Sequence, residues 1–253
     1  MDACRQGQQG GASDRKNRFL MIVDYDANDL FSNAMLFQRF GYNICTARTA
    51  EEAFDMAGVA VPALIVAATE LPGIGLVGLL KKLRGNPPTA SVPVIAMSSS
   101  GSPVLRTHCI EAGASECVAK PINIEEMYRA VQAAVEATPR ENIRIRVRFP
   151  IVVNGEALDC GGGDCVSTLS ERGMYIRTRK PLHVNERVNL LFVLAGRTIR
   201  ISAVVLYSDP RGEGPYHEPG MGLKFTTISA EDQAFLHDHI HAEVAGGIDR
   251  RRE

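Results

Sequence analysis

Short apolar runs of strand length alternate with amphipathic helical segments through the first half of the chain. The apolar runs lie at residues 19–24, 42–46, 63–67, 93–97 and 117–119. Apolar side chains recur at helical spacing at residues 28–40, 50–57, 76–83, 104–112 and 124–137. Five strand–helix units in succession predict an α/β, doubly wound domain, in which helices cover both faces of a parallel sheet.

The pattern changes after Pro139, a residue that cannot continue a helix interior. Arginines alternate with apolar residues at 144–149, and short strands are expected at residues 151–153, 165–169, 174–177, 187–194, 198–208 and 221–225. Ser229 then begins a helix-capping pattern, and Phe235, Leu236 and Ile240 share one face of the helix that follows. This half is therefore predicted to be a small antiparallel β-barrel with a C-terminal helix.

The length of 253 residues fits two ordinary domains. We expect a disordered polar tail at 1–17, the α/β domain at 18–138, the barrel domain at 139–243 and a charged tail at 244–253. The net charge of −1 argues against a general polyanion binder. Because no segment reaches the roughly 18 apolar residues of a membrane span and the N-terminus lacks a secretory apolar region, we expect a cytoplasmic protein with reduced cysteines and no membrane insertion.

Several segments of the first half together resemble the response-regulator receiver family, over residues 18–137. They are VDYD at 23–26, LPG at 71–73, PVIAMS at 93–98, GA at 113–114 and AKP at 119–121. Functional side chains of such sheets lie at the carboxyl ends of the strands, which carry Asp24, Ala68, Ser98 and Lys120. The resemblance implies an acidic pair after the first strand and a phosphorylated aspartate four residues before the proline of the LPG turn.

This chain departs from that pattern at the phosphoacceptor. Ala68 stands four residues before Pro72, and a methyl group cannot accept a phosphoryl group. Tyr25 occupies the second acidic position, which leaves few carboxylates for Mg²⁺. Glu70 is a weak substitute acceptor, because it lies two residues further on and its side chain should point elsewhere. The first domain is thus interpreted as a receiver-like domain (pseudo-receiver) that phosphorylation does not switch.

The remaining receiver-like residues have a simpler structural explanation. We expect Lys120 to pair with Asp24 across the strand ends and Ser98 to cap the adjacent turn. By resemblance, an unidentified protein partner would dock on the helix at 104–112, the strand at 117–119 and the helix at 124–137. A homodimer through this domain is a further expectation.

Three segments of the second half resemble the PilZ family, over residues 140–241. They are Arg144-x-x-x-Arg148 followed by Phe149-Pro150, TLSERG at 168–173, and GMGLKF at 220–225 running into the serine-initiated helix. The resemblance implies cyclic di-GMP as the ligand. Its candidate binding residues are Arg144, Arg148, Thr168, Ser170 and Gly173.

These residue types suit a ligand with two phosphates and two guanines. A guanidinium binds a phosphate in two places, pairs with the guanine edge or stacks on the base. Ser170 supplies a hydroxyl, and Gly173 permits a close approach of the backbone. Thr168 stands where ligand-binding members of the family usually have Asp or Asn, and this loss is expected to cost about 1–3 kcal/mol. Arg140-x-x-x-Arg144 has the same spacing, but Phe149-Pro150 favours the 144/148 register.

Other candidate sites are weaker. No catalytic constellation is apparent, so we expect a non-enzymatic protein. Cys160 and Cys165 lack the four ligands of a structural zinc ion, and a glycine-rich turn explains them better. His237 and His241 share a helix face but are interpreted as surface histidines, so no metal is predicted. The helix at 230–241 has too few basic residues for DNA recognition.

Two functions remain open from the sequence. The first is a cyclic di-GMP effector whose receiver-like domain reports ligand binding to a protein partner. The alternative is a ligand-independent adaptor in which both domains are degenerate, as Ala68 and Thr168 suggest. The family is compatible with control of motility, pili, surface polysaccharide or development.

Overall fold

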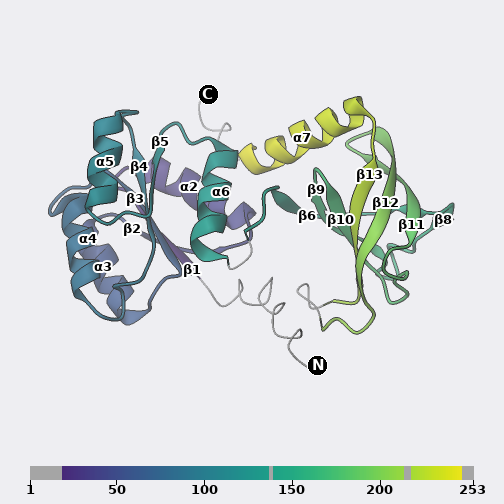
Figure 1. The fold of residues 1–253 in the computed structure, drawn as a ribbon, viewed down its shortest axis with the longest axis horizontal. Coiled ribbons are helices and arrows are strands. Elements are labelled where there is room, and N and C mark those ends of the chain that lie inside the picture. Colours follow the sequence, from purple (N-terminus) through teal and green to yellow (C-terminus); the bar gives the residue numbers. More distant parts are fainter. Residues whose placement is uncertain (1–18, 137–138, 214–217, 247–253) are drawn as a thin grey trace, which may run out of the picture. The chain divides into compact units, whose positions relative to one another are not determined.

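The structure is a computed structural model that describes residues 19–136, 139–213 and 218–246 (Figure 1). These residues form two compact units, which divide between Glu141 and Asn142. The predicted tail at 1–17 and all but the first three residues of the tail at 244–253 lie outside the described residues. Within the described ranges, no helix has the length and apolar character needed to cross a bilayer.

The first unit is built around a five-stranded parallel sheet with the order β2-β1-β3-β4-β5. Its strands are β1 (Phe19–Val23), β2 (Asn43–Ala47), β3 (Leu64–Ala68), β4 (Val94–Ser98) and β5 (Glu116–Ala119). Its helices are α2 (Ala27–Arg39), α3 (Ala50–Val59), α4 (Gly75–Gly85), α5 (Pro103–Glu111) and α6 (Ile124–Val135). Helices α3, α4 and α5 cover one face, and α2 and α6 cover the other (Figure 1). The predicted doubly wound α/β fold is confirmed.

Burial on both faces explains why β3 and β4 are continuously apolar. Every residue of these two strands is buried, including the polar Ser98 at the end of β4. On one face, alanines and leucines of α3 and α4 pack against the sheet in a single hydrophobic core. On the other, Phe40 makes edge contacts with Phe37 of α2 and Tyr128 of α6. The two cores hold the carboxyl ends of the strands in fixed positions.

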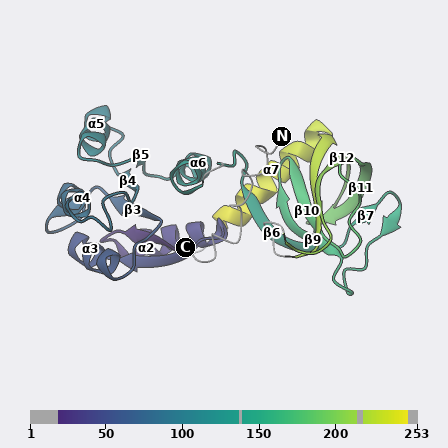
Figure 2. The ribbon, with the colours of Figure 1, turned by 60° about the horizontal axis from the view of Figure 1, so that its bottom comes forward.

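The second unit is an eight-stranded antiparallel sheet with the order β6-β9-β10-β13-β12-β11-β7-β8. Its strands are β6 (Arg144–Phe149), β7 (Val152–Val153), β8 (Glu156–Ala157), β9 (Cys165–Ser170), β10 (Gly173–Arg177), β11 (Arg187–Leu194), β12 (Arg197–Asp209) and β13 (Gly220–Thr227). The sheet curls into a half-barrel, and helix α7 (Ala230–Ala245) follows it (Figure 2). The curl brings Phe149 of β6 against Phe192 of β11, with ring centroids 5.3 Å apart. The small barrel and its C-terminal helix are confirmed.

Two-residue turns join consecutive strands at three places in this sheet, and at two of them both turn residues have positive φ. Ala195 and Gly196 have φ angles of 46° and 82°, and they form the hairpin between β11 and β12. Asn154 and Gly155 have φ angles of 52° and 89° and join β7 to β8. Positive φ at both positions is typical of hairpin turns with Asn-Gly. Strand β8 was not predicted, although this Asn-Gly pair was the available signal.

Helix α7 buries a slightly different set of residues from the predicted one. Leu236, Ile240 and Val244 are buried, whereas Phe235 is partly exposed and lies under the guanidinium of Arg197. The helix ends at Ala245, two residues after the predicted end of this half at 243. Val244 explains the extension, because it is the next apolar position on the face that Leu236 and Ile240 begin.

Candidate functional site

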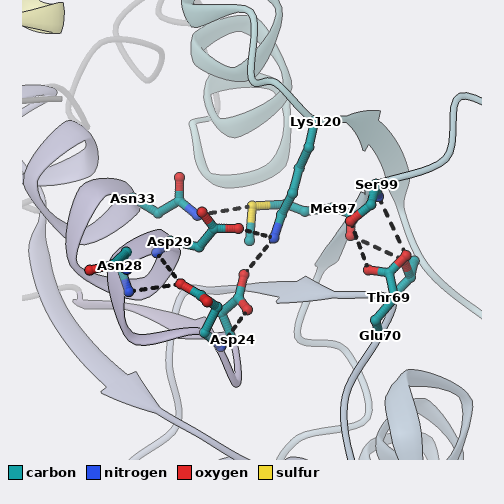
Figure 3. Close-up of polar contacts among 10 residues, drawn as sticks. Asp24, Asn28, Asp29, Asn33, Thr69, Glu70, Met97, Ser99 and Lys120 are labelled. Atoms are coloured by element: carbon teal, nitrogen blue, oxygen red, sulfur yellow. Dashed lines mark hydrogen bonds and ion pairs between the residues drawn. The ribbon is translucent and has the colours of Figure 1, made fainter. Parts of the chain in front are cut away.

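The first candidate site lies at the carboxyl ends of β1 and β5. We call it the receiver pocket, defined as Asp24, Asp29 and Lys120. Lys120 Nζ lies 2.7 Å from Asp24 Oδ2 and 2.7 Å from Asp29 Oδ2 (Figure 3). Asp24 is fully buried, and its other carboxylate oxygen accepts the Asp26 N–H at 3.1 Å. Burial alone would lower the pKa of Lys120, but the hydrogen bonds to Asp24 and Asp29 outweigh burial and the pKa is raised. The ammonium is therefore held between two carboxylates, and the expected contact with Asp24 is present.

Asp26 and Asp29 show how the start of α2 shapes this pocket. The Asp26 carboxylate caps the helix by accepting the N–H groups of Asn28 at 2.8 Å and Asp29 at 3.0 Å. The bonds from Asp29 and Asn28 lower the pKa of Asp26. This first turn directs the side chain of Asp29 to Lys120. Asp29 was not predicted as a site residue, although an acidic residue three positions after a helix cap was a usable signal.

The residues around the missing phosphoacceptor are engaged with one another. Ala68 is fully buried at the end of β3. Two residues later, the Glu70 carboxylate accepts the N–H and the hydroxyl of Ser99, each at 3.4 Å. Figure 3 shows Glu70 directed to Ser99 and away from the Asp24–Lys120 pair. Glu70 therefore contacts the loop after β4 and does not occupy the position of a phosphoacceptor.

Ser98 closes the turn after β4, as its expected capping role requires. Its hydroxyl donates to the Ser100 carbonyl at 2.7 Å and accepts the Ser100 N–H at 3.1 Å. Ser98 itself is almost completely buried. The hydroxyl is thus part of the local backbone structure.

The second candidate site lies on the half-barrel, where β6 pairs with β9. Arg144 is directly opposite Ser170, and Arg146 is directly opposite Thr168. Residues directly opposite in an antiparallel pair project to the same face. Ile145 and Leu169, which lie between them in the ladder, are buried on the other face. The register therefore gives Arg144 and Arg146 the same face as the serine and threonine of the TLSERG segment.

The same face continues across two more strands. Gly173 of β10 is opposite Ser170 on one side and opposite Lys224 of β13 on the other. Arg146 and Lys224 are exposed. We call this group the cationic platform, defined as Arg144, Arg146, Thr168, Ser170, Gly173 and Lys224. Neither Arg146 nor Lys224 was predicted as a site residue. The alternation of arginines with apolar residues in β6 was a signal for Arg146, whereas only the strand register reveals Lys224.

Ser170 and Gly173 also have roles inside the protein. The Ser170 hydroxyl donates to the Gly173 carbonyl at 2.9 Å, and the serine is mostly buried. A Cβ atom at Gly173 would collide with the Leu223 carbonyl oxygen of β13. Glycine is therefore needed at this position for the close approach of the neighbouring strand.

Arg148 differs from Arg144 in its surroundings. The β6–β9 register shifts between Arg146 and Phe149, so Arg148 does not continue the row of directly paired residues. Its guanidinium donates to the Cys160 carbonyl at 3.5 Å. Arg140 precedes β6, and its backbone N–H donates to Gln132 Oε1 at 3.2 Å. Of the predicted arginines, Arg144 alone belongs to the cationic platform.

Comparison with known proteins assigns both halves of the chain. The response regulator receiver domain family matches residues 20–132, and the PilZ domain family matches residues 138–242. The response regulator PleD of Caulobacter vibrioides is 28% identical over 116 residues, which cover 46% of this chain and 25% of that protein. The phosphate regulon transcriptional regulatory protein PhoB of Pseudomonas aeruginosa is 26% identical over 141 residues, which cover 55% of this chain and 59% of that protein.

A solved structure, the chemotaxis response regulator CheY4 of Vibrio cholerae, aligns with 21% identity and a TM-score of 0.44 over 46% of this chain and 98% of that one. The chain spans less than two thirds of the length of the curated relatives described above. Receiver and PilZ domains are signalling domains. The chain therefore belongs to the signalling proteins that join a response regulator receiver domain to a PilZ domain.

Proposed function

We propose that this signalling protein is a non-enzymatic, cytoplasmic effector of cyclic di-GMP, which binds on the cationic platform. The observation that carries the proposal is the row of directly paired residues across four strands, Arg144, Ser170, Gly173 and Lys224. Two cationic residues lie at the ends of this row, and two small residues lie between them. A flat, doubly charged dinucleotide fits such a surface, because no bulky side chain lies between the two cations and the cations meet its phosphates.

Arg146 and Thr168 form the neighbouring row of the same platform. Arg146 is exposed, so it can stack on a guanine base or pair with the guanine edge. Thr168 offers one hydroxyl, whereas a carboxylate would accept two guanine N–H groups. We expect an affinity roughly tenfold or more below that of a platform with aspartate at this position.

Calorimetric titration of the full chain with cyclic di-GMP tests this proposal. We expect a saturable binding isotherm in the wild type and at least about a tenfold weaker one in Arg144→Ala, the loss of one charge-assisted contact. The matched control is Arg187→Ala, which removes an exposed arginine from the start of β11. Absence of heat at high micromolar ligand, or equal affinity in Arg144→Ala and the wild type, would contradict the proposal.

We further propose that the receiver domain is not a phosphorylation switch and serves as a docking module. The Ala68 side chain has no oxygen to phosphorylate, and the Lys120 ammonium donates hydrogen bonds to Asp24 and Asp29. Helix α5 exposes Val104 and Ile110, two apolar residues on the face expected to contact a protein partner or a second copy of the domain. Incubation with acetyl phosphate and Mg²⁺ should leave the mass of the protein unchanged; a stable phosphoryl adduct on the receiver domain would overturn this proposal.

A ligand-independent adaptor is the competing function. It is favoured by the internal hydrogen bond of Ser170 and by the contact of Arg148 with the Cys160 carbonyl, because both groups are used within the protein. The adaptor predicts no nucleotide binding and a partner whose affinity is the same with and without cyclic di-GMP. The titration described above separates the two functions.

A further inference from the structure

Three metal-ligating side chains meet in the PilZ unit, between the β9–β10 turn and helix α7. His237 and His241 are four residues apart on α7, and their ring centroids are 4.2 Å apart. Glu171 lies in the turn and directs Oε1 at both rings. This oxygen is 3.1 Å from His237 Nδ1 and 3.9 Å from His241 Nε2. Residues far apart in the sequence thus direct two imidazole nitrogens and one carboxylate oxygen at a common point.

The spacing of these atoms is close to that of a zinc site. Their ligand atoms all lie within 4.8 Å of one another. Zinc binds nitrogen and carboxylate oxygen at about 2.0–2.2 Å, which puts neighbouring ligands of a tetrahedron about 3.3 Å apart. The side chains of His237, His241 and Glu171 are 43%, 23% and 20% exposed, so each has room for the small rotation that would close the remaining gap.

The chemistry of the three groups points to the same class of ion. Two histidines at i and i+4 on one helix face are a known chelating pair for zinc. Neutral imidazole and carboxylate together suit borderline divalent transition metals such as Zn²⁺, whereas Mg²⁺ and Ca²⁺ prefer sites made of oxygen alone. A Glu–His hydrogen bond accounts for His237 by itself, but it does not explain why His241 also faces the same carboxylate oxygen.

We propose that Glu171, His237 and His241 bind one Zn²⁺ ion, with water in the fourth coordination position. The ion ties the β9–β10 turn to α7, two elements separated by about 60 residues of sequence. It replaces the interpretation of these histidines as ordinary surface residues. The site does not depend on cyclic di-GMP, since none of its three ligands belongs to the cationic platform.

Isothermal titration of the metal-free full chain with ZnCl₂ tests the proposal, with Co²⁺ as a spectroscopic probe. We expect one high-affinity zinc equivalent and the visible absorption of tetrahedral Co²⁺. Loss of an outer-shell partner of a metal ligand weakens metal binding by up to about 100-fold. Because His237 and His241 would bind the ion directly, His237→Ala and His241→Ala should each weaken zinc binding by at least this factor. Glu171→Gln should weaken binding while conserving the size of the side chain.

His239→Ala is the matched control, because His239 lies on the same helix but stacks on Phe235 instead of facing Glu171. It should bind zinc as the wild type does, and circular dichroism should show that all five variants, including the double variant described next, are folded. Unchanged zinc affinity in the His237→Ala/His241→Ala double variant would overturn the proposal. A cobalt–thiolate charge-transfer band would also overturn it, since that band would assign the ion to the cysteines.

Discussion

The two candidate sites of this chain contain similar numbers of charged groups, but they use them in opposite ways. In the receiver pocket, Lys120 lies between Asp24 and Asp29 at 2.7 Å from each, and the charges neutralise one another inside the protein. On the cationic platform, Arg146 and Lys224 project from neighbouring rows of a sheet and are exposed. Charges satisfied within the fold mainly stabilise it, whereas exposed cations of one sign attract an anionic ligand. We therefore expect the first site to contribute mainly to stability and the second to ligand recognition.

The largest expected effect follows removal of the cation of the receiver pocket. Lys120→Ala leaves the fully buried Asp24 carboxylate without its ammonium partner. Loss of one member of a buried ion pair costs about 3–5 kcal/mol. Because the Lys120 side chain retains 17% exposure, water should compensate in part, and we expect about 2–4 kcal/mol lower free energy of unfolding. Urea denaturation of the full chain, followed for the receiver transition, measures this loss.

Two variants sharpen this test of the receiver pocket. Lys81→Ala, which removes an exposed lysine from α4, should change stability little. Asp24→Asn combined with Lys120→Met should recover part of the loss, because the buried charge is removed together with its partner. A Lys120→Ala protein as stable as the wild type would show that the two ion pairs do not support the fold.

The next largest effect concerns the role of Gly173. Gly173→Ala introduces a Cβ atom against the Leu223 carbonyl of β13, and the strands must separate to accept it. We expect a loss of about 1–3 kcal/mol of stability, the usual cost of overpacking, with or without the nucleotide. Thermal unfolding measures it. Gly58→Ala is the control, since Gly58 lies in α3 with open space around it and alanine favours a helix by about 0.5–1 kcal/mol.

If Gly173→Ala weakened nucleotide binding but left stability unchanged, the glycine would be required for the ligand and not for the sheet. That result would show that Gly173 belongs to the groups that bind the ligand and not to those that stabilise the fold. Gly173 would then have the ligand-binding role that the sequence predicted for it.

A smaller effect, on nucleotide affinity, is expected from the loss of Lys224, the platform residue on β13. Lys224→Ala removes one exposed ammonium and should weaken cyclic di-GMP binding by about tenfold, or 1.4 kcal/mol, if it contacts a phosphate. Stability should not change, because Lys224 is exposed on β13. Titration calorimetry at two salt concentrations measures both the loss and the weaker salt dependence that accompanies it. Equal affinity in Lys224→Ala and the wild type would show that β13 does not contribute to ligand binding.

The smallest effect is expected at Ser98. Ser98→Ala removes the hydroxyl that closes the turn to Ser100, and a hydrogen bond of this kind contributes about 0.5–1.5 kcal/mol. Denaturation should detect a loss in this range, and nucleotide affinity should be the same as in the wild type. A larger change in nucleotide affinity than in stability would show that the receiver pocket takes part in ligand recognition. That result would contradict the expected division between a stabilising site and a ligand-binding site.

The sequence contained most of the information about the fold, because its main signals are local. The alternation of strands and helices predicted the α/β domain, and the succession of short strands after Pro139 predicted the antiparallel domain. The pairing of Lys120 with Asp24 also followed from the strand ends. Asn154-Gly155 was a local signal of the same kind, and it would have predicted β8.

The candidate site was predicted less completely, since it depends on contacts between distant segments. Lys224 enters the platform only through the pairing of β13 with β10, which periodicity cannot reveal. The bulge after Arg146 separates Arg148 from the row that regular alternation would give it. Glu171 and His241 are about 70 residues apart, and they meet only when α7 packs beside the β9–β10 turn.

The proposed function depends most on the ability of the cationic platform to recognise guanine as well as negative charge. The most direct measurement is a pair of calorimetric titrations of the full chain, one with cyclic di-GMP and one with cyclic di-AMP, which has the same two phosphates. We expect cyclic di-GMP to bind at least about tenfold more tightly, because the arginines pair with the O6 and N7 acceptors of guanine. Equal affinity for the two nucleotides, or binding of neither, would contradict the account.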